Sequence, residues 1–162
     1  MLAAGRSGRD YRTLFEAVRG RDIRLHVVCD STDALAGLDV PPKVVVLRNC
    51  YGSAYINELA GASIVAVPLA VNDISAGQMV MIQAMALGKP VVVTRTPTTQ
   101  EYVTDNVQAL LVPRADPAAM RSAIEALLSS PERIDEMGRA GLQTFEEKFS
   151  MRSYVRNVLA AI

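Results

Sequence analysis

The stretch that decides the fold is residues 72–94, NDISAGQMVMIQAMALGKPVVVT. A turn leads into an apolar helix, a Gly-Lys-Pro break ends the helix, and a β-branched strand follows. The helix is apolar nearly all round, so we expect it to be buried against a sheet. A strand that directly follows such a helix is typical of folds in which parallel strands alternate with helices.

The same alternation continues along the rest of the chain. Strands are predicted at 1–5, 23–29, 43–47, 64–69, 90–94 and 109–113, and helices at 11–18, 52–62, from 97, 116–129, 131–148 and 150–161. Gly20 follows the first helix where a C-cap glycine is expected. The pattern predicts one doubly wound α/β domain, residues 1–162, with a parallel sheet covered on both faces and a helical C-terminus.

Composition limits the possible partners. The 162 residues are 50% hydrophobic, and 17 basic residues balance 17 acidic ones, so neither nucleic acid nor an anionic membrane is favoured as a partner. Two cysteines, Cys29 and Cys50, are too few for a disulfide scaffold. No signal peptide or membrane span is predicted, which favours the cytoplasm. His26, in a strand-like run, is expected to be a packed core residue.

The loop that enters the helix at residue 77 is the first candidate site. Ser75 and Gln78 form the spacing of a capping box, with Gly77 between them in the predicted first turn. Free N–H groups at a helix start bind anions, phosphate above all. The alternative is that Ser75 only caps the helix and Gly77 only packs. Gln83, inside the same helix, needs a hydrogen-bond partner, from either the neighbouring backbone or a ligand.

The loop after the first strand, AAGRSGRDY, is the second candidate. Arg6 and Arg9 lie three residues apart, between and after two glycines. The loop is neither a Walker loop nor G-x-G-x-x-G, and six arginines in the first 24 residues also fit a solvated face. Ligands of doubly wound sheets bind at the carboxyl ends of the strands. The two loops together therefore predict a diphosphate clamp, with helix amides on one side and paired arginines on the other.

These blocks, in this order, resemble the C-terminal, donor-binding domain of the retaining glycosyltransferases of group 1, or family four. The resemblance covers AAGRSGRDYRTLFEAV, AGASIVAVPLAVNDISAGQMVMIQAMALGKPVVVT, and TPTTQEYVTDNVQALLVPRADPAAMRSAIEALL. It implies half of a two-domain GT-B enzyme that transfers a sugar, as a hexosyltransferase does, from UDP or GDP to a glycan or glycolipid. It implies no metal or other cofactor, an acceptor domain absent from these 162 residues, and little activity without that domain. It leaves open a peripheral position at the inner face of the membrane.

The resemblance also implies roles for particular residues. Arg6, Arg9 and Ser75 take the catalytic positions, although the family usually has glutamates where Ser75 and Gln83 stand. Gln83 would contact the ribose, Asp73 could substitute for the first glutamate, and Arg48 and Asn49 fall near the base. The remaining predicted donor contacts are Gly5, Gly77, Gln78 and Met79. The Met79 side chain itself is expected to pack in the core, like Tyr11.

Two further functions stay open. A nucleotide-binding or partner-binding module without catalysis is suggested by the replaced glutamates. A nucleotide-sugar epimerase of similar architecture would need acid–base side chains in the cleft, and the sole histidine, His26, falls within a strand.

Overall fold

The computed structural model describes residues 1–31, 33–70 and 75–160, and its centre is one six-stranded parallel sheet. The strands are β1 (Leu2–Ala4), β2 (Leu25–Val28), β3 (Val44–Leu47), β4 (Val65–Val67), β5 (Val91–Thr94) and β6 (Ala109–Val112). Their spatial order is β3-β2-β1-β4-β5-β6. The order reverses between β1 and β4, and this arrangement confirms the predicted doubly wound α/β fold.

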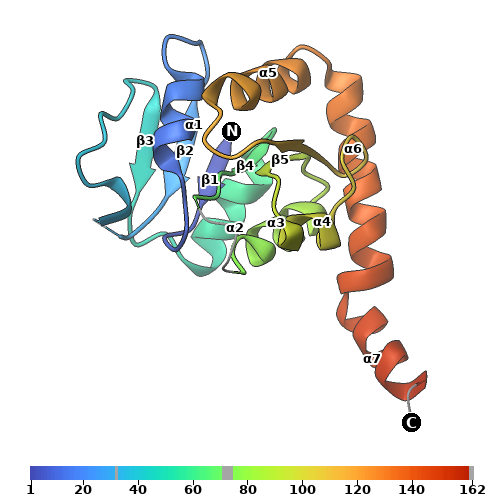
Figure 1. Ribbon diagram of the computed structural model, residues 1–162. Helices are drawn as coiled ribbons and strands as arrows, with labels where there is room; N and C mark the ends of the chain where they lie inside the picture. Colours follow the sequence, from blue (N-terminus) through green and yellow to red (C-terminus); the bar gives the residue numbers. More distant parts are fainter. Residues whose placement is uncertain (32, 71–74, 161–162) are drawn as a thin grey trace.

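Helices cover both faces of the sheet (Figure 1). On one face lie α1 (Tyr11–Val18) and α5 (Pro117–Leu128); on the other lie α2 (Gly52–Gly61), α3 (Gln78–Ala86) and α4 (Pro97–Tyr102). Successive strand residues point to opposite faces, so Ala3 packs with the α1 and α5 core whereas Leu2 and Ala4 pack with the α3 core. The fully apolar strands follow from this double burial.

At several helix ends, the residues that the sequence marks as caps have that role in the structure. Gly20 has a φ of +71° directly after the C-cap of α1, as predicted. Asp116 caps α5 by accepting a hydrogen bond from the Ala119 N–H at 2.8 Å. Thr96 caps α4 with Pro97 at the first helical position.

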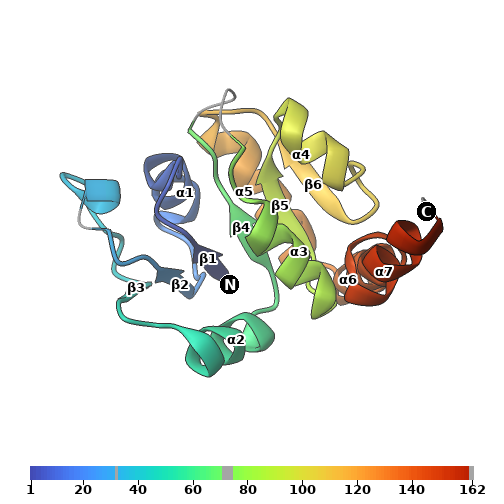
Figure 2. The same cartoon turned by 90° about the horizontal axis from the view of Figure 1, so that it is seen from below.

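The C-terminal helices run along the side of the sheet next to α3 and then beyond the domain (Figures 1 and 2). They are α6 (Pro131–Thr144) and α7 (Met151–Ala160), joined by a π-helical turn at Phe145–Phe149. The helix predicted at 131–148 therefore ends as an α-helix four residues early. A Cβ added at Gly138 of α6 would overlap the carbonyl oxygen of Gly88, so the backbones of α6 and of the α3–β5 turn touch at this point.

Candidate functional site

The loop after β1 and the start of α3 meet where the strand order reverses, and together they line one pocket. We call it the switch-point pocket; its lining includes the predicted residues Arg6, Arg9, Ser75, Gly77, Gln78 and Met79. Segments almost seventy residues apart in sequence are thus brought together, as the sheet rule predicts.

The two arginines of the β1 loop have different surroundings. Arg9 is partly buried; its Nε donates to the Ala4 carbonyl at 2.8 Å and its Nη1 donates to the Ser7 carbonyl at 3.0 Å. Burial lowers the pKa of Arg9, yet a guanidinium stays charged at neutral pH. Arg6 is exposed and forms no hydrogen bond or ion pair with any residue in the described ranges. Arg9 therefore braces the loop, and Arg6 is the arginine available to a ligand.

The start of α3 differs from the predicted capping box. Gly77 is the N-cap, with a left-handed φ of +89°, so the helix begins at Gln78 and Gly77 lies before the first turn. Ser75 is then too early to cap the first turn, and its hydroxyl instead accepts a hydrogen bond from the Gln78 side-chain amide. A Cβ at Gly77 would lie 2.8 Å from Val67 Cγ1, so this glycine is required for packing and backbone geometry. The prediction of a capping box formed by Ser75 and Gln78 was wrong, and so was the prediction that Gly77 lies in the first turn of the helix.

The prediction that the Met79 side chain packs in the core was also wrong. It is 65% exposed at the mouth of the switch-point pocket, not in the core, because only one side of α3 faces the sheet. Tyr11, by contrast, is buried as predicted, and its hydroxyl donates to the Gly5 carbonyl.

A second pocket, of about 340 Å³, adjoins the first, because Arg6 and Val80 line both. We call it the strand-end pocket; Gly5, Asp30, Cys50, Tyr51, Tyr55 and Gln83 are among its lining residues. Gln83 is half-buried there, and its Oε1 accepts a hydrogen bond from the Tyr55 hydroxyl at 2.9 Å. The protein partner of this amide is therefore a side chain of α2, not the neighbouring backbone.

The residues predicted near the base, Arg48 and Asn49, are exposed and outside the lining of this pocket. They hold Asp30 instead: the Asn49 N–H donates to Asp30 Oδ1 at 2.6 Å, and Arg48 Nη1 donates to the Asp30 carbonyl at 3.4 Å. The Tyr51 hydroxyl and the Asn49 N–H lower the pKa of Asp30. Asp30 is therefore an ionised carboxylate at the pocket rim.

Sequence reasoning missed Asp30, Cys50, Tyr51 and Tyr55 as lining residues. Asp30 and Cys50 closely follow the carboxyl ends of β2 and β3, so the rule that ligands bind at strand ends could have found them. Tyr55 lies one turn into α2, and only the packing of α2 beside α3 turns it toward the site.

Two other predicted residues remain. Asp73 lies outside the described residues. His26 is not a packed core residue: its ring is 31% exposed, and Nδ1 lies 2.6 Å from Glu58 Oε2 near the amino ends of the strands, away from both pockets. Among the described residues, no three His, Cys, Asp or Glu side chains lie together as a metal-binding group.

A doubly wound sheet with adjoining pockets at its switch point is typical of the α/β folds that bind ligands at the carboxyl ends of their strands. The model of the family described as glycosyl transferases group 1 matches residues 11–130, which are most of the chain. The chain therefore belongs to the group 1 glycosyl transferases.

Individual relatives agree with this assignment. The chain is 34% identical over 100 residues to a D-inositol 3-phosphate glycosyltransferase of Segniliparus rotundus, a match that covers 62% of the chain and 21% of that protein. In fold it is similar to Anabaena Alr3699/HepE, a structure with bound UDP and glucose (TM-score 0.81, 14% identity, 99% of this chain and 48% of that one). It is also similar to the C-terminal domain of the Francisella tularensis group 1 protein LpcC (TM-score 0.73, 16% identity, 93% and 85%).

The chain thus spans only about a fifth of the curated relative and about half of the Anabaena protein. No helix in the described ranges is both long and apolar enough to cross a bilayer.

Proposed function

We propose that this chain is the domain of a retaining glycosyltransferase that binds the donor nucleotide sugar, with the acceptor held by a separate domain. The observation that carries the proposal is the pair of adjoining pockets, joined by Arg6 at the switch point of the sheet. The Anabaena protein of the same fold binds UDP and glucose, which supports a nucleoside diphosphate sugar as the ligand. In this proposal the acceptor is a glycan or glycolipid, and no metal or cofactor takes part.

The chemistry assigned to the chain is electrostatic. When the glycosidic C–O bond of the donor breaks, negative charge builds up on the departing diphosphate, and a fixed cation stabilises that charge. The exposed guanidinium of Arg6 forms no hydrogen bond or ion pair with a described residue, although its charge helps to lower the pKa of Asp30, and it can form charge-assisted bonds to phosphate oxygens. Arg9 supports it by fixing the loop through the Ala4 and Ser7 carbonyls.

Binding of the diphosphate is tested by calorimetric titration with UDP, GDP and uridine. Arg6→Ala should weaken the affinity for UDP about 10-fold to 100-fold, the usual effect of losing a hydrogen bond to a charged group, and leave uridine nearly unchanged. Arg12→Ala is the control, because Arg12 is exposed on α1 and lines neither pocket. Equal losses for UDP and uridine would contradict the clamp, and a folded wild-type protein that binds neither UDP nor GDP would contradict the function.

A second candidate is a module that binds a nucleotide without catalysis. It is favoured by one observation: Asp30 is the only carboxylate among the described residues that line the two pockets, and it lies at the rim. An acceptor domain encoded directly upstream of this segment would favour the transferase. Its absence, together with tight UDP binding, would favour the module.

A further inference from the structure

One end of the Gln83 amide is bonded to Tyr55. The side chains come from different helices, α2 and α3, and both line the strand-end pocket. The Tyr55 hydroxyl donates to Gln83 Oε1 at 2.9 Å. Burial raises the pKa of Tyr55, so its hydroxyl keeps the proton that it donates.

An amide has one acceptor oxygen and two N–H donors. The Tyr55 hydroxyl occupies one of the two lone pairs of Gln83 Oε1 and turns this oxygen toward α2, whereas Nε2 forms no hydrogen bond with any residue that the structure describes. A glutamate at this position would have no donor at all and would offer only acceptor oxygens. The two side chains are similar in shape and opposite in hydrogen-bond character.

We propose that Tyr55 orients Gln83 so that the strand-end pocket offers N–H donors to the sugar hydroxyls of the nucleotide. This inference rests on the proposed function. Each ribose hydroxyl then serves as an acceptor, and its own proton is not needed for the bond. Tyr55 is a positioning residue, and Gln83 sets the specificity for ligand groups that accept.

A ligand oxygen that can accept a hydrogen bond but cannot donate one distinguishes a donating amide at position 83 from an accepting side chain there. The probes are UDP and its 2′-O-methyl and 3′-O-methyl derivatives, titrated calorimetrically against the wild-type protein, Q83E and Y55F. The quantity compared is the methylation penalty, the ratio of the dissociation constants of the methylated and unmethylated nucleotides. Steric effects of the methyl group and the added charge of Q83E act similarly on both ligands of one protein, so they largely cancel when penalties are compared.

For at least one of the two hydroxyls, we expect the penalty in Q83E to exceed that of wild type by about tenfold or more, since methylation removes a hydrogen bond to a charged acceptor. In Y55F the amide is free to rotate and accept, so its penalty should rise about threefold. If Q83E does not fold, as judged by circular dichroism, Y55F carries the test alone.

Equal penalties at both positions in wild type and Q83E, or an unchanged penalty in Y55F, would overturn the inference. In those cases UDP binding that depends on Arg6 would leave the proposed function standing. A wild-type protein that binds no UDP or GDP would instead overturn the proposed function itself, and the inference with it.

Discussion

At the scale of single residues, Gly77 is the position where backbone and packing requirements coincide. Its φ of +89° suits glycine alone without strain, and its missing Cβ leaves room for Val67 of β4. The residue lies directly before α3 and lines the switch-point pocket, so its conformation sets where the helix begins at this pocket.

Gly77→Ala should lower the free energy of unfolding by about 1–3 kcal/mol, because it combines left-handed strain with a contact at Val67 Cγ1. Urea denaturation of the two proteins measures the difference. Gly61→Ala is the matched control: nothing lies within 4 Å of a Cβ there, and a helical glycine gains stability, if anything, on replacement by alanine. Equal effects at the two sites would contradict this account of Gly77.

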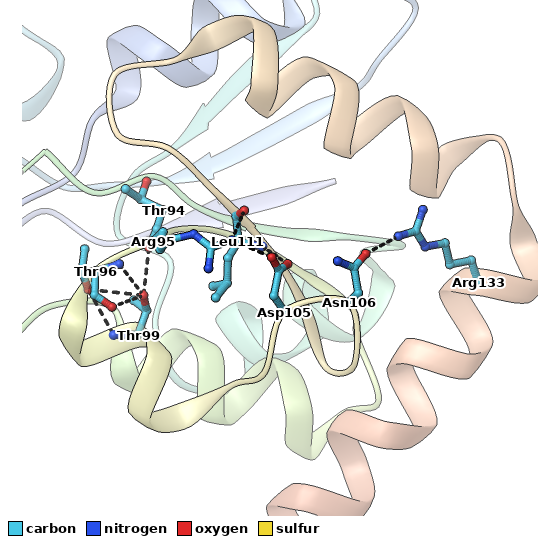
Figure 3. A network of polar contacts seen from close by, with 8 residues as sticks. All are labelled: Thr94, Arg95, Thr96, Thr99, Asp105, Asn106, Leu111 and Arg133. Atoms are coloured by element: carbon cyan, nitrogen blue, oxygen red, sulfur yellow. Dashed lines mark hydrogen bonds and ion pairs between the residues drawn. The ribbon is translucent and has the colours of Figure 1, made fainter.

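At the scale of elements, the connection from β5 through α4 to β6 is held by buried polar contacts (Figure 3). Thr99 Oγ1 accepts from the Thr96 N–H at 2.9 Å and donates to the Thr94 carbonyl at 3.0 Å. Thr94 Oγ1 in turn accepts from the Leu69 N–H at 2.9 Å, which joins α4 to the end of β4. Thr99 is fully buried, so the Thr96 N–H and the Thr94 carbonyl depend on its hydroxyl for these bonds.

Thr99→Val keeps the shape of the side chain and removes the hydroxyl. We expect the free energy of unfolding to fall by about 1–3 kcal/mol, the cost of leaving buried polar groups without partners. Thr98→Val should change it by less than about 0.5 kcal/mol, since Thr98 is only half-buried and its hydroxyl bonds to no described residue. A similar loss from both variants in guanidinium titrations would show that the hydroxyl of Thr99 has no special part.

Asp105 makes the stability of the same β5–α4–β6 connection depend on pH. Burial raises the pKa of Asp105, but the hydrogen bond from the Leu111 N–H and the Arg95 guanidinium together bring it below its ordinary value of 3.8. A lowered folded pKa contributes stability above pH 3.8, and that contribution is lost as the pH falls through the folded value. The wild type should exceed Asp105→Asn by about 1 kcal/mol in unfolding free energy at pH 7, after solvent screening, and this difference should shrink as the pH is lowered below 3.8. A difference that is constant across this range would contradict the mechanism.

Much of this element-level structure could be predicted from the sequence, for identifiable reasons. Double burial of each strand gives the apolar runs from which the sheet was predicted, and residues such as Thr96, Pro97 and Asp116 mark helix starts by local chemistry. The start of α3 could not be predicted from Ser75 and Gln78, because the capping-box spacing says nothing of the left-handed turn that Gly77 makes between them.

The site was predictable only where it depends on single loops. Arg6, Arg9 and the start of α3 were predicted together because strand ends meet at one edge of a parallel sheet. The bond between Tyr55 and Gln83 joins residues 28 positions apart on two helices, and their relative placement is set by tertiary packing. The exposure of Met79 was missed because an evenly apolar helix gives no periodic sign of which side faces outward.

At the scale of the whole molecule, α7 is an appendage to the domain. Ser153 is the only buried residue among those described in it, and its exposed apolar side chains are Met151, Tyr154, Val155, Val158 and Leu159. The helix projects past the sheet (Figures 1 and 2), and it is tied to the π turn by Ser153 and Arg156, which donate to the Glu147 carbonyl at 2.5 and 3.1 Å.

Deleting residues 151–162 should therefore keep a single cooperative thermal transition and lower the melting temperature by no more than about 8 °C. UDP affinity should stay the same, because no described residue of α7 lines either pocket. Circular dichroism melts and titrations of the shortened and full chains measure both quantities. Loss of the cooperative transition would show that α7 is an integral part of the core.

At Gly138, the backbone of α6 lies directly against the backbone of Gly88 in the α3–β5 turn. A tilt of α6 at this contact would grow along the C-terminal helices. At 1.5 Å per residue, the helical segment from Gly138 to Ala160 reaches at most about 33 Å, so a tilt of about 10° at the contact would displace its far end by roughly 6 Å. No side chain separates the two backbones at this point, whereas one turn further along α6 Gly141 lies against the Met85 side chain of α3. The direction of α7 is thus set at two places: where Gly138 meets Gly88, and at the extended backbone of Ser150 with the bonds from α7 to the Glu147 carbonyl.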